Sequence, residues 1–180
     1  MNIISKVITI TGLFSLALIS GCNQDEKKDI AVPEPIIIQN GEECDLCGMY
    51  INRFPGPKGQ VFERGLTTAK RFCSTRDMFA YALQPEHQHR IEHIFVHDVA
   101  SAPWDEQEKA QYIDATTAFF VVGHKLKGAM GPALASFSKQ QDAEQFSTEH
   151  GGKIIGFSEI DIESLSAMSH QAMNHESMNH

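Results

Sequence analysis

Sulfur-bearing side chains are concentrated in one short stretch of the sequence, from Cys44 to Met49 (CDLCGM). A Cys-x-x-Cys pair is compatible with a redox disulfide, with half of a zinc site or with a site for a soft metal ion. The thioether of Met49 favours the soft ion, because thiolate and thioether donors together select Cu(I) over Zn(II). In a strand, Cys47 and Met49 would point to the same face with Gly48 between them.

Two other interpretations of the cysteine pair stay open. A thiol-disulfide oxidoreductase using Cys44 and Cys47 is expected to place the pair at the start of a helix, whereas a strand-like run follows it here. A structural zinc site commonly has four ligands, and the only other cysteine besides the predicted lipidation site Cys22 is Cys73, so a histidine would have to complete the set. A disulfide between Cys44 and Cys47 would block the proposed metal site.

A third sulfur ligand is predicted at Met130, which lies among small residues in the run Lys127 to Gly131 (KGAMG). The alternative for any single methionine is that it fills a gap in the core. His124 is a candidate for a fourth ligand, with water or no ligand as the other possibilities. A second histidine cluster, at His87, His89, His93 and His97, is more typical of surface or hydrogen-bonded side chains.

The C-terminal segment 165–180 contains a Met-x-His array that repeats every five residues. The three repeats are Met168 to His170, Met173 to His175 and Met178 to His180. Thioether and imidazole donors in a polar segment without apolar periodicity predict a disordered tail that binds copper weakly and captures it for exchange. A solvated tail with biased composition is the alternative.

The N-terminus predicts a lipoprotein signal peptide over residues 1–21. Lys6 is followed by an apolar run at 7–19, and Ile19-Ser20-Gly21-Cys22 is typical of a lipobox, so Cys22 is the predicted lipidation site. The apolar run is too short for a transmembrane helix. We therefore expect a lipid-anchored protein on the periplasmic side, in the outer membrane if Asn23 acts as the sorting residue, with 22–41 as a flexible tether.

Composition narrows the classes of function. Hydrophobic residues make up 42% of the chain and charged residues 21%, as in an ordinary globular protein, and the formal net charge of −8 disfavours nucleic acid as a partner. No phosphate loop, nucleophile elbow or Ser-His-Asp order is present in the sequence. The chain is accordingly expected not to be an enzyme. Three cysteines after lipidation leave at least one thiol unpaired, and metal ligation is one use for it.

The folded part is predicted to be α+β, with two similar ββαβ units packed together at 42–110 and 111–164. In the first unit the sequence predicts a hairpin from Met49 to Ile51 and Val61-Phe62, a helix that begins at Ser74 and ends by Pro85, and a strand at Ile94 to Val96. In the second it predicts a strand at Ala118 to Val122, an apolar run at Pro132 to Phe137, a helix between Ser138 and His150, and a strand at Ile154 to Phe157. Ser74 with Asp77, and Ser138 with Gln141, are predicted capping boxes.

Several motifs together resemble those of the NosL family, copper lipoproteins accessory to nitrous oxide reductase. They are Cys47-Gly48-Met49, Phe54 to Gly59 (FPGPKG), Phe72 to Thr75 (FCST), Val96 to Asp98 (VHD), Trp104, Ile113 to Thr116 (IDAT) and Lys125 to Gly131 (KLKGAMG). The resemblance extends from the lipobox to about Ile160, and the tail lies outside it.

The resemblance implies that two ββαβ units face each other and hold Cu(I) between them. It places the metal ligands at Cys47, Met49 and Met130, and gives no firm role to Cys44 or Cys73. It further implies delivery of copper to the copper centres of nitrous oxide reductase through a membrane transporter complex, and thus a role in denitrification. The copper-gathering role of the tail is inferred from this sequence alone.

Overall fold

The computed structural model describes residues 32–166 and 168 of the chain. The predicted signal peptide, the lipidation site Cys22 and most of the Met/His-rich tail lie outside these residues. Among the described residues, no helix has the length and apolar character needed to cross a membrane.

The first sheet has four antiparallel strands in the order β2-β1-β3-β4. The strands are β1 (Gly59–Glu63), β2 (Lys70–Phe72), β3 (Ile91–His97) and β4 (Tyr112–Asp114), and the helices α1 (Thr75–Ala82) and α2 (Pro85–Gln88) connect β2 to β3. Pro85 ends the first helical stretch as predicted, and it then occupies the first turn of α2, where its missing N–H is tolerated.

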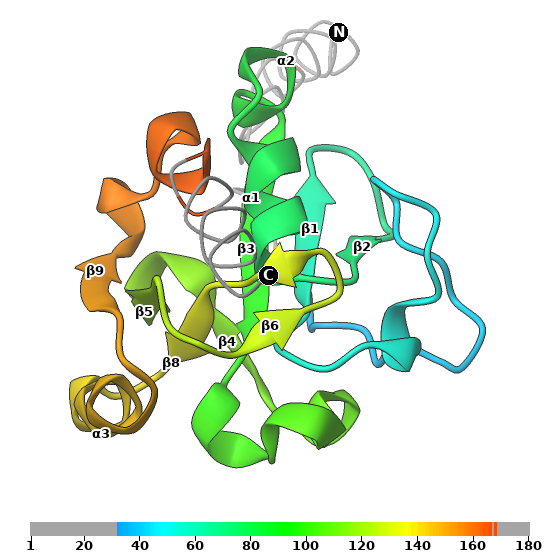
Figure 1. Ribbon diagram of the computed structural model, residues 1–180. Coiled ribbons are helices and arrows are strands. Elements are labelled where there is room, and N and C mark those ends of the chain that lie inside the picture. The colour runs from blue at the N-terminus through cyan, green and yellow to red at the C-terminus, as the bar shows by residue number, and fades with distance from the viewer. Residues whose placement is uncertain (1–31, 167, 169–180) are drawn as a thin grey trace, which may run out of the picture. The chain divides into compact units, whose positions relative to one another are not determined.

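The second sheet has three antiparallel strands in the order β8-β5-β9. These are β5 (Phe119–Val122), β8 (Ala135–Phe137) and β9 (Lys153–Gly156), with α3 (Gln140–His150) between β8 and β9. A small hairpin of β6 (Lys127–Gly128) and β7 (Gly131–Pro132) is inserted between β5 and β8. In Figure 1 the second sheet and α3 lie to the left, with α1 and β1 at the centre and right.

The two sheets repeat one topology, which confirms the α+β class with two ββαβ units. In each unit the first strand is central, the second and third strands flank it, and the helix follows the second strand. β4 lies at the start of the range assigned to the second unit, yet it pairs with β3 of the first sheet. Side-chain hydrogen bonds join the units, and two of them lie at the end of β3: the Ser136 hydroxyl donates to the His97 carbonyl at 2.7 Å, and that of Ser138 donates to the Asp98 carboxylate at 2.5 Å.

Two local predictions are wrong. Met49 to Ile51 does not form a strand, because Ile51 begins the short 3-10 helix η2 (Ile51–Arg53). Ser138 does not cap α3, whose N-cap is Lys139 without a side-chain bond, since the Ser138 hydroxyl is used by Asp98. The other 3-10 segments are η3 (Val99–Ser101), η4 (Trp104–Lys109), η5 (Ala115–Thr117) and η6 (Phe157–Glu159).

Two helix boundaries follow the sequence prediction. The Ser74 hydroxyl accepts a hydrogen bond from the Asp77 amide at 3.0 Å and so caps the start of α1. α3 ends at His150, where Gly151 adopts a φ of +76° that favours glycine.

One main core combines residues of both units. It contains Phe72 and Phe79 from β2 and α1, Phe120 from β5 and Leu134 from the segment before β8. Leu165 and Met168 are buried in the same core, so the packed chain extends beyond residue 164. At the other end, the backbone amide and carbonyl of Ile36 form two hydrogen bonds with the buried side-chain amide of Gln60. Part of the segment 32–41 therefore contacts the first sheet.

Candidate metal centre

Three thiols and one carboxylate meet at a single place on the first unit. The Sγ atoms of Cys44, Cys47 and Cys73 and a carboxylate oxygen of Asp77 all lie within 4.8 Å of one another. Cys44, Cys73 and Asp77 are buried and Cys47 is exposed. Among the described residues this is the one group of three or more Cys, His, Asp or Glu side chains with the spacing of a metal site.

A tight turn presents the first two thiols. The Gly48 amide donates to the Cys44 carbonyl at 2.9 Å, and the Cys44 amide donates back to the Met49 carbonyl at 2.9 Å. Gly48 has a φ of +74°, a conformation that side chains disfavour, so glycine is needed here for the backbone. The expectation that strand geometry aligns Cys47 with Met49 is therefore wrong, because a turn holds these residues.

The third thiol is supplied where β2 ends and α1 begins. Cys73 is fully buried and precedes the N-cap Ser74. Its Sγ lies 3.5 Å from the Sγ of Cys47 and donates to the Asp77 carboxylate at 3.3 Å. The first turn of α1 thus carries a hydrogen-bond acceptor that fixes the orientation of Cys73.

Burial and hydrogen bonding within the cluster shift the pKa values of the three thiols in different directions. The hydrogen bond with Cys73 lowers the pKa of Cys44 to about 5, although burial opposes this shift. The same interaction, burial and the charge of Asp77 raise the pKa of Cys73. Burial is also the main cause that raises the pKa of Cys47. These opposite shifts make Cys44 the most acidic of the three thiols.

This donor set suits a soft cation. Three sulfurs within reach of one point favour Cu(I), while a single carboxylate is a harder donor that is already engaged with Cys73. Because Cys47 is exposed, one sulfur is accessible to a partner molecule that supplies or receives the ion.

The predicted methionine ligands lie in segments that adjoin the cluster. Met49 is half-buried and packs against the main core, which includes Cys44 and Cys73. Met130 lies in the turn between β6 and β7, 49% exposed, and its carbonyl accepts a hydrogen bond from Arg76 at 3.2 Å. Arg76 follows Cys73 by three residues, so the second unit brings the Met130 turn to the start of α1. Their coordination of an ion stays a prediction.

The two buried histidines, His124 and His97, lie outside the cysteine cluster. His124 is buried with edge-to-face contacts to Trp104 and Phe146, and burial lowers its pKa to about 4. His97 is also buried, and burial together with Lys58 lowers its pKa to about 3. Neither belongs to the cysteine cluster, and a role of His124 as a fourth ligand is not supported by this group.

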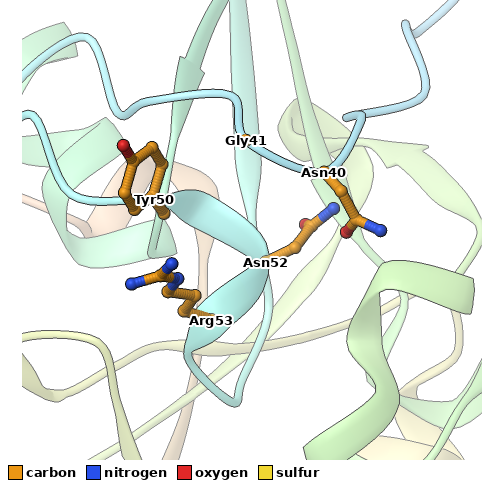
Figure 2. Close-up of a pocket in the computed structure, with 5 residues that line it drawn as sticks. All are labelled: Asn40, Gly41, Tyr50, Asn52 and Arg53. Carbon is orange, nitrogen blue, oxygen red and sulfur yellow. The ribbon is translucent and has the colours of Figure 1, made fainter.

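A separate pocket of about 440 Å³ lies next to the cysteine-bearing turn. Figure 2 shows its lining, with Tyr50 beside Arg53 and the side chains of Asn40 and Asn52 across from them. The guanidinium carbon of Arg53 lies 4.6 Å from the centre of the Tyr50 ring. None of the lining residues carries sulfur, so the pocket offers no soft ligand.

Sequence reasoning placed no ligand at Cys73 or Asp77. The sequence predicts a helix-capping role for Asp77, but only its amide takes part in the cap, while its carboxylate accepts a hydrogen bond from the Cys73 thiol. The sequence signal for a ligand at this position is the third thiol itself, because Cys73 directly precedes the predicted start of a helix at Ser74.

Comparison with known proteins agrees with this chemistry. The family model NosL matches residues 35–165. The copper-binding lipoprotein NosL of Stutzerimonas stutzeri is 42% identical over 156 residues, which cover 84% of this chain and 80% of that protein. The protein of the same name from Achromobacter cycloclastes is 35% identical over 150 residues, or 81% of this chain and 76% of the relative.

A solved structure shares the fold. The crystal structure of the copper chaperone NosL from Shewanella denitrificans aligns with a TM-score of 0.70 at 41% sequence identity, over 73% of this chain and 98% of that chain. With the family model, the relatives and the fold in agreement, the chain belongs to the NosL family.

Proposed function

We propose that this protein is a Cu(I) metallochaperone that delivers copper for assembly of the copper centres of nitrous oxide reductase, through the membrane transporter complex that serves that enzyme. Two lines of support lead to it. Its relatives are named copper-binding lipoproteins and a copper chaperone. Its own structure gathers three thiols at one place.

The convergence of Cys44, Cys47 and Cys73 is the observation that carries the proposal. Thiolates bind Cu(I) tightly, and low-coordinate Cu(I) does not need a closed cage of four ligands. A chaperone must also release its ion, and the exposed Cys47 sulfur can be approached by an acceptor ligand while the other sulfur ligands still hold the ion. A resident structural zinc would instead favour a closed, four-ligand site.

The proposed ligands are Cys47, Met49 and Met130, with Cys73 as the nearest further sulfur. Cys47 belongs both to the structural cluster and to the predicted set. The thioethers of Met49 and Met130 would strengthen the preference for Cu(I), since methionine has little affinity for harder ions. Asp77 acts in this proposal as the hydrogen-bond partner that orients Cys73.

The proposed location is the periplasmic side of the outer membrane, with Cys22 carrying the lipid. The lipobox supports the anchor. The Met/His-rich tail would gather copper near the site. Met168 of its first repeat is buried in the core, so this role falls to the repeats at 173–175 and 178–180, outside the described residues. Truncation after Met168 should slow copper uptake from a weak donor, and an unchanged uptake rate would remove the tail from the mechanism.

Metal competition tests the proposal. The reduced apo-protein is titrated anaerobically with Cu(I) against a chromophoric Cu(I) chelator, and with excess Zn(II) as a competitor. We expect one tightly bound Cu(I) outside the tail, lost in Cys47→Ser and retained in Leu46→Ala, an exposed residue of the same turn. Preferential retention of zinc would support a structural zinc site instead, and disulfide reductase turnover would support an oxidoreductase using Cys44 and Cys47.

Delivery needs its own test. In cells that produce nitrous oxide reductase and its transporter complex, deletion of this protein should yield a reductase that lacks copper. The wild-type gene should restore its copper content, and the Cys47→Ser gene should not. Full copper loading of the reductase without this protein would refute the proposed role in delivery.

A further inference from the structure

A lysine is buried beside the cysteine cluster. Lys58 of the FPGPKG segment is only 1% exposed. Its ammonium donates to the carbonyls of Phe54 at 2.6 Å, Pro55 at 3.2 Å and Cys73 at 3.2 Å. All three ammonium hydrogens thus have backbone acceptors, and one of those acceptors belongs to a residue of the cluster.

The charge of this lysine has no carboxylate partner. Among the described residues no Asp or Glu forms a salt bridge with Lys58, and the carboxylate of Glu108 stabilises the ammonium only from beyond salt-bridge distance. The Lys58 amide points to Nδ1 of His97 at 3.4 Å, and that imidazole is neutral because its pKa is lowered to about 3. Burial lowers the pKa of Lys58 to about 8, so the ammonium is charged at neutral pH.

A buried, unpaired cation is costly, and carbonyl dipoles alone offset only part of that cost. The nearest place where negative charge can develop is the thiol cluster when an ion replaces its protons. We propose that Lys58 is the counter-charge of the metal-bound thiolate cluster and biases the site toward monovalent over divalent ions. This inference rests on the proposed function and adds to it the cause of the ion selectivity.

The direction of the effect follows from Coulomb's law. For the same set of thiolates, a complex with a monovalent ion carries one more negative charge than a complex with a divalent ion. A fixed positive charge nearby therefore stabilises the monovalent complex more, and the dry surroundings of Lys58 leave this interaction poorly screened. Removing the charge should therefore weaken binding of the monovalent ion more than binding of the divalent ion.

The test measures affinities for Ag(I), a redox-inert analogue of Cu(I), and for Cd(II), below pH 7 in the full mature chain. In Lys58→Met the ratio of Ag(I) to Cd(II) affinity should fall roughly tenfold or more relative to wild type, as expected for one poorly screened charge. The matched control is Lys70→Met, since Lys70 is a partly exposed lysine on β2 that lies 3.7 Å from Asp45. The control should leave the ratio unchanged, because solvent screens such a charge.

Equal losses of affinity for both ions in Lys58→Met would overturn the proposal and leave Lys58 as a clamp of the 54–57 loop. Lys58→Gln, which keeps a hydrogen-bond donor without the charge, should shift the ratio in the same direction. If neither variant folds, the NMR chemical shift of the Lys58 side-chain nitrogen in the wild-type protein tests the proposal. It should move more on loading with Ag(I) than with Cd(II), and equal or absent shifts would refute the inference. A wild-type protein that binds neither ion tightly would instead refute the proposed function.

Discussion

The hydroxyl of Thr75 makes two hydrogen bonds to the backbone of Leu134, donating to its carbonyl at 2.7 Å and accepting from its amide at 3.1 Å. Both residues are fully buried. Thr75 is the first residue of α1, two positions after Cys73, and Leu134 lies four positions after Met130. The pair therefore joins the segments of the two units that carry the thiol cluster and the predicted thioether ligand.

Thr75→Val tests this junction. Valine has nearly the same shape, but it leaves the buried amide and carbonyl of Leu134 without this partner. We expect the free energy of unfolding to fall by about 2–6 kcal/mol, since each of the two unpaired buried polar groups costs about 1–3 kcal/mol. Urea unfolding of the apo-protein measures the change. The control is Thr148→Val on the exposed face of α3, with an expected change within about 0.5 kcal/mol. Equal stability of the two variants would show that the Thr75 bonds are not needed.

The methionine ligands can be separated from the cysteines by Met49→Leu and Met130→Leu. Each change removes a thioether and keeps an apolar side chain of similar size. We expect each to weaken Cu(I) binding by roughly tenfold or more, since soft donors dominate the affinity for this ion. The competition titration with a Cu(I) chelator measures this loss. Met130 is 49% exposed, so Met130→Leu should leave the stability of the apo-protein unchanged.

An unchanged Cu(I) affinity in both methionine variants, together with a loss in Cys73→Ser, would replace the predicted ligand set by the three thiols. A loss of Cu(I) affinity in Met130→Leu but not in Met49→Leu would show that Met130 of the second unit is a ligand and that Met49 is not. Each result assigns the ion to a defined set of donors, because all variants are measured against the same chelator.

The sequence predicted those features that depend on local patterns. Apolar runs located β3, β5, β8 and β9 within a few residues. Ser74 was identified as the cap of α1 because its spacing to Asp77 is a local signal. The duplicated order of elements was also readable along the chain. Each of these predictions depends on residues that are close in sequence.

Features that depend on distant contacts could not be predicted from the sequence. The turn at Gly48 replaced a strand, since a positive φ leaves no mark in an apolar pattern. Ser138 binds Asp98, 40 residues earlier, in place of the α3 amides. Cys73 meets Cys47 only because β2 returns beside the turn at 44–48, where the Asp45 amide donates to the Arg71 carbonyl at 2.9 Å. Burial of Lys58 was equally hidden, as lysine is usually exposed.

Gly59 tests the packing of α1 on β1. A Cβ atom added at Gly59 would lie 2.3 Å from Sδ and 2.9 Å from Cβ of Met78, a fully buried residue. We expect Gly59→Ala to lower the free energy of unfolding by about 1–3 kcal/mol through overpacking. Gly156→Ala is the matched control in β9, since its nearest contact would be Glu159 Oε2 at 3.6 Å. Combination with Met78→Ala should recover part of the loss, and simple additivity of the two losses would contradict a steric cause.

The buried imidazoles predict how stability depends on pH. The pKa of His124 is lowered to about 4 and that of His97 to about 3, in both cases chiefly by burial, from an ordinary value near 6.5. Above pH 6.5 neither state binds the proton, so their contribution to stability is complete. As the pH falls below 6.5, the unfolded chain takes up protons that the folded chain excludes. Stability then falls by about 1.4 kcal/mol per pH unit for each histidine, until the pH reaches the folded pKa.

His124→Phe isolates one of these contributions. Phenylalanine suits the aromatic contacts with Trp104 and Phe146 and cannot titrate. Urea unfolding at a series of pH values between 6.5 and 4 should give a slope that is smaller by about 1.4 kcal/mol per pH unit in this variant than in the wild type. His89→Gln, at an exposed position, should keep the wild-type slope. If the slopes of His124→Phe and wild type coincide, then His124 is protonated in the folded protein, and burial of a neutral imidazole between the aromatic rings is ruled out.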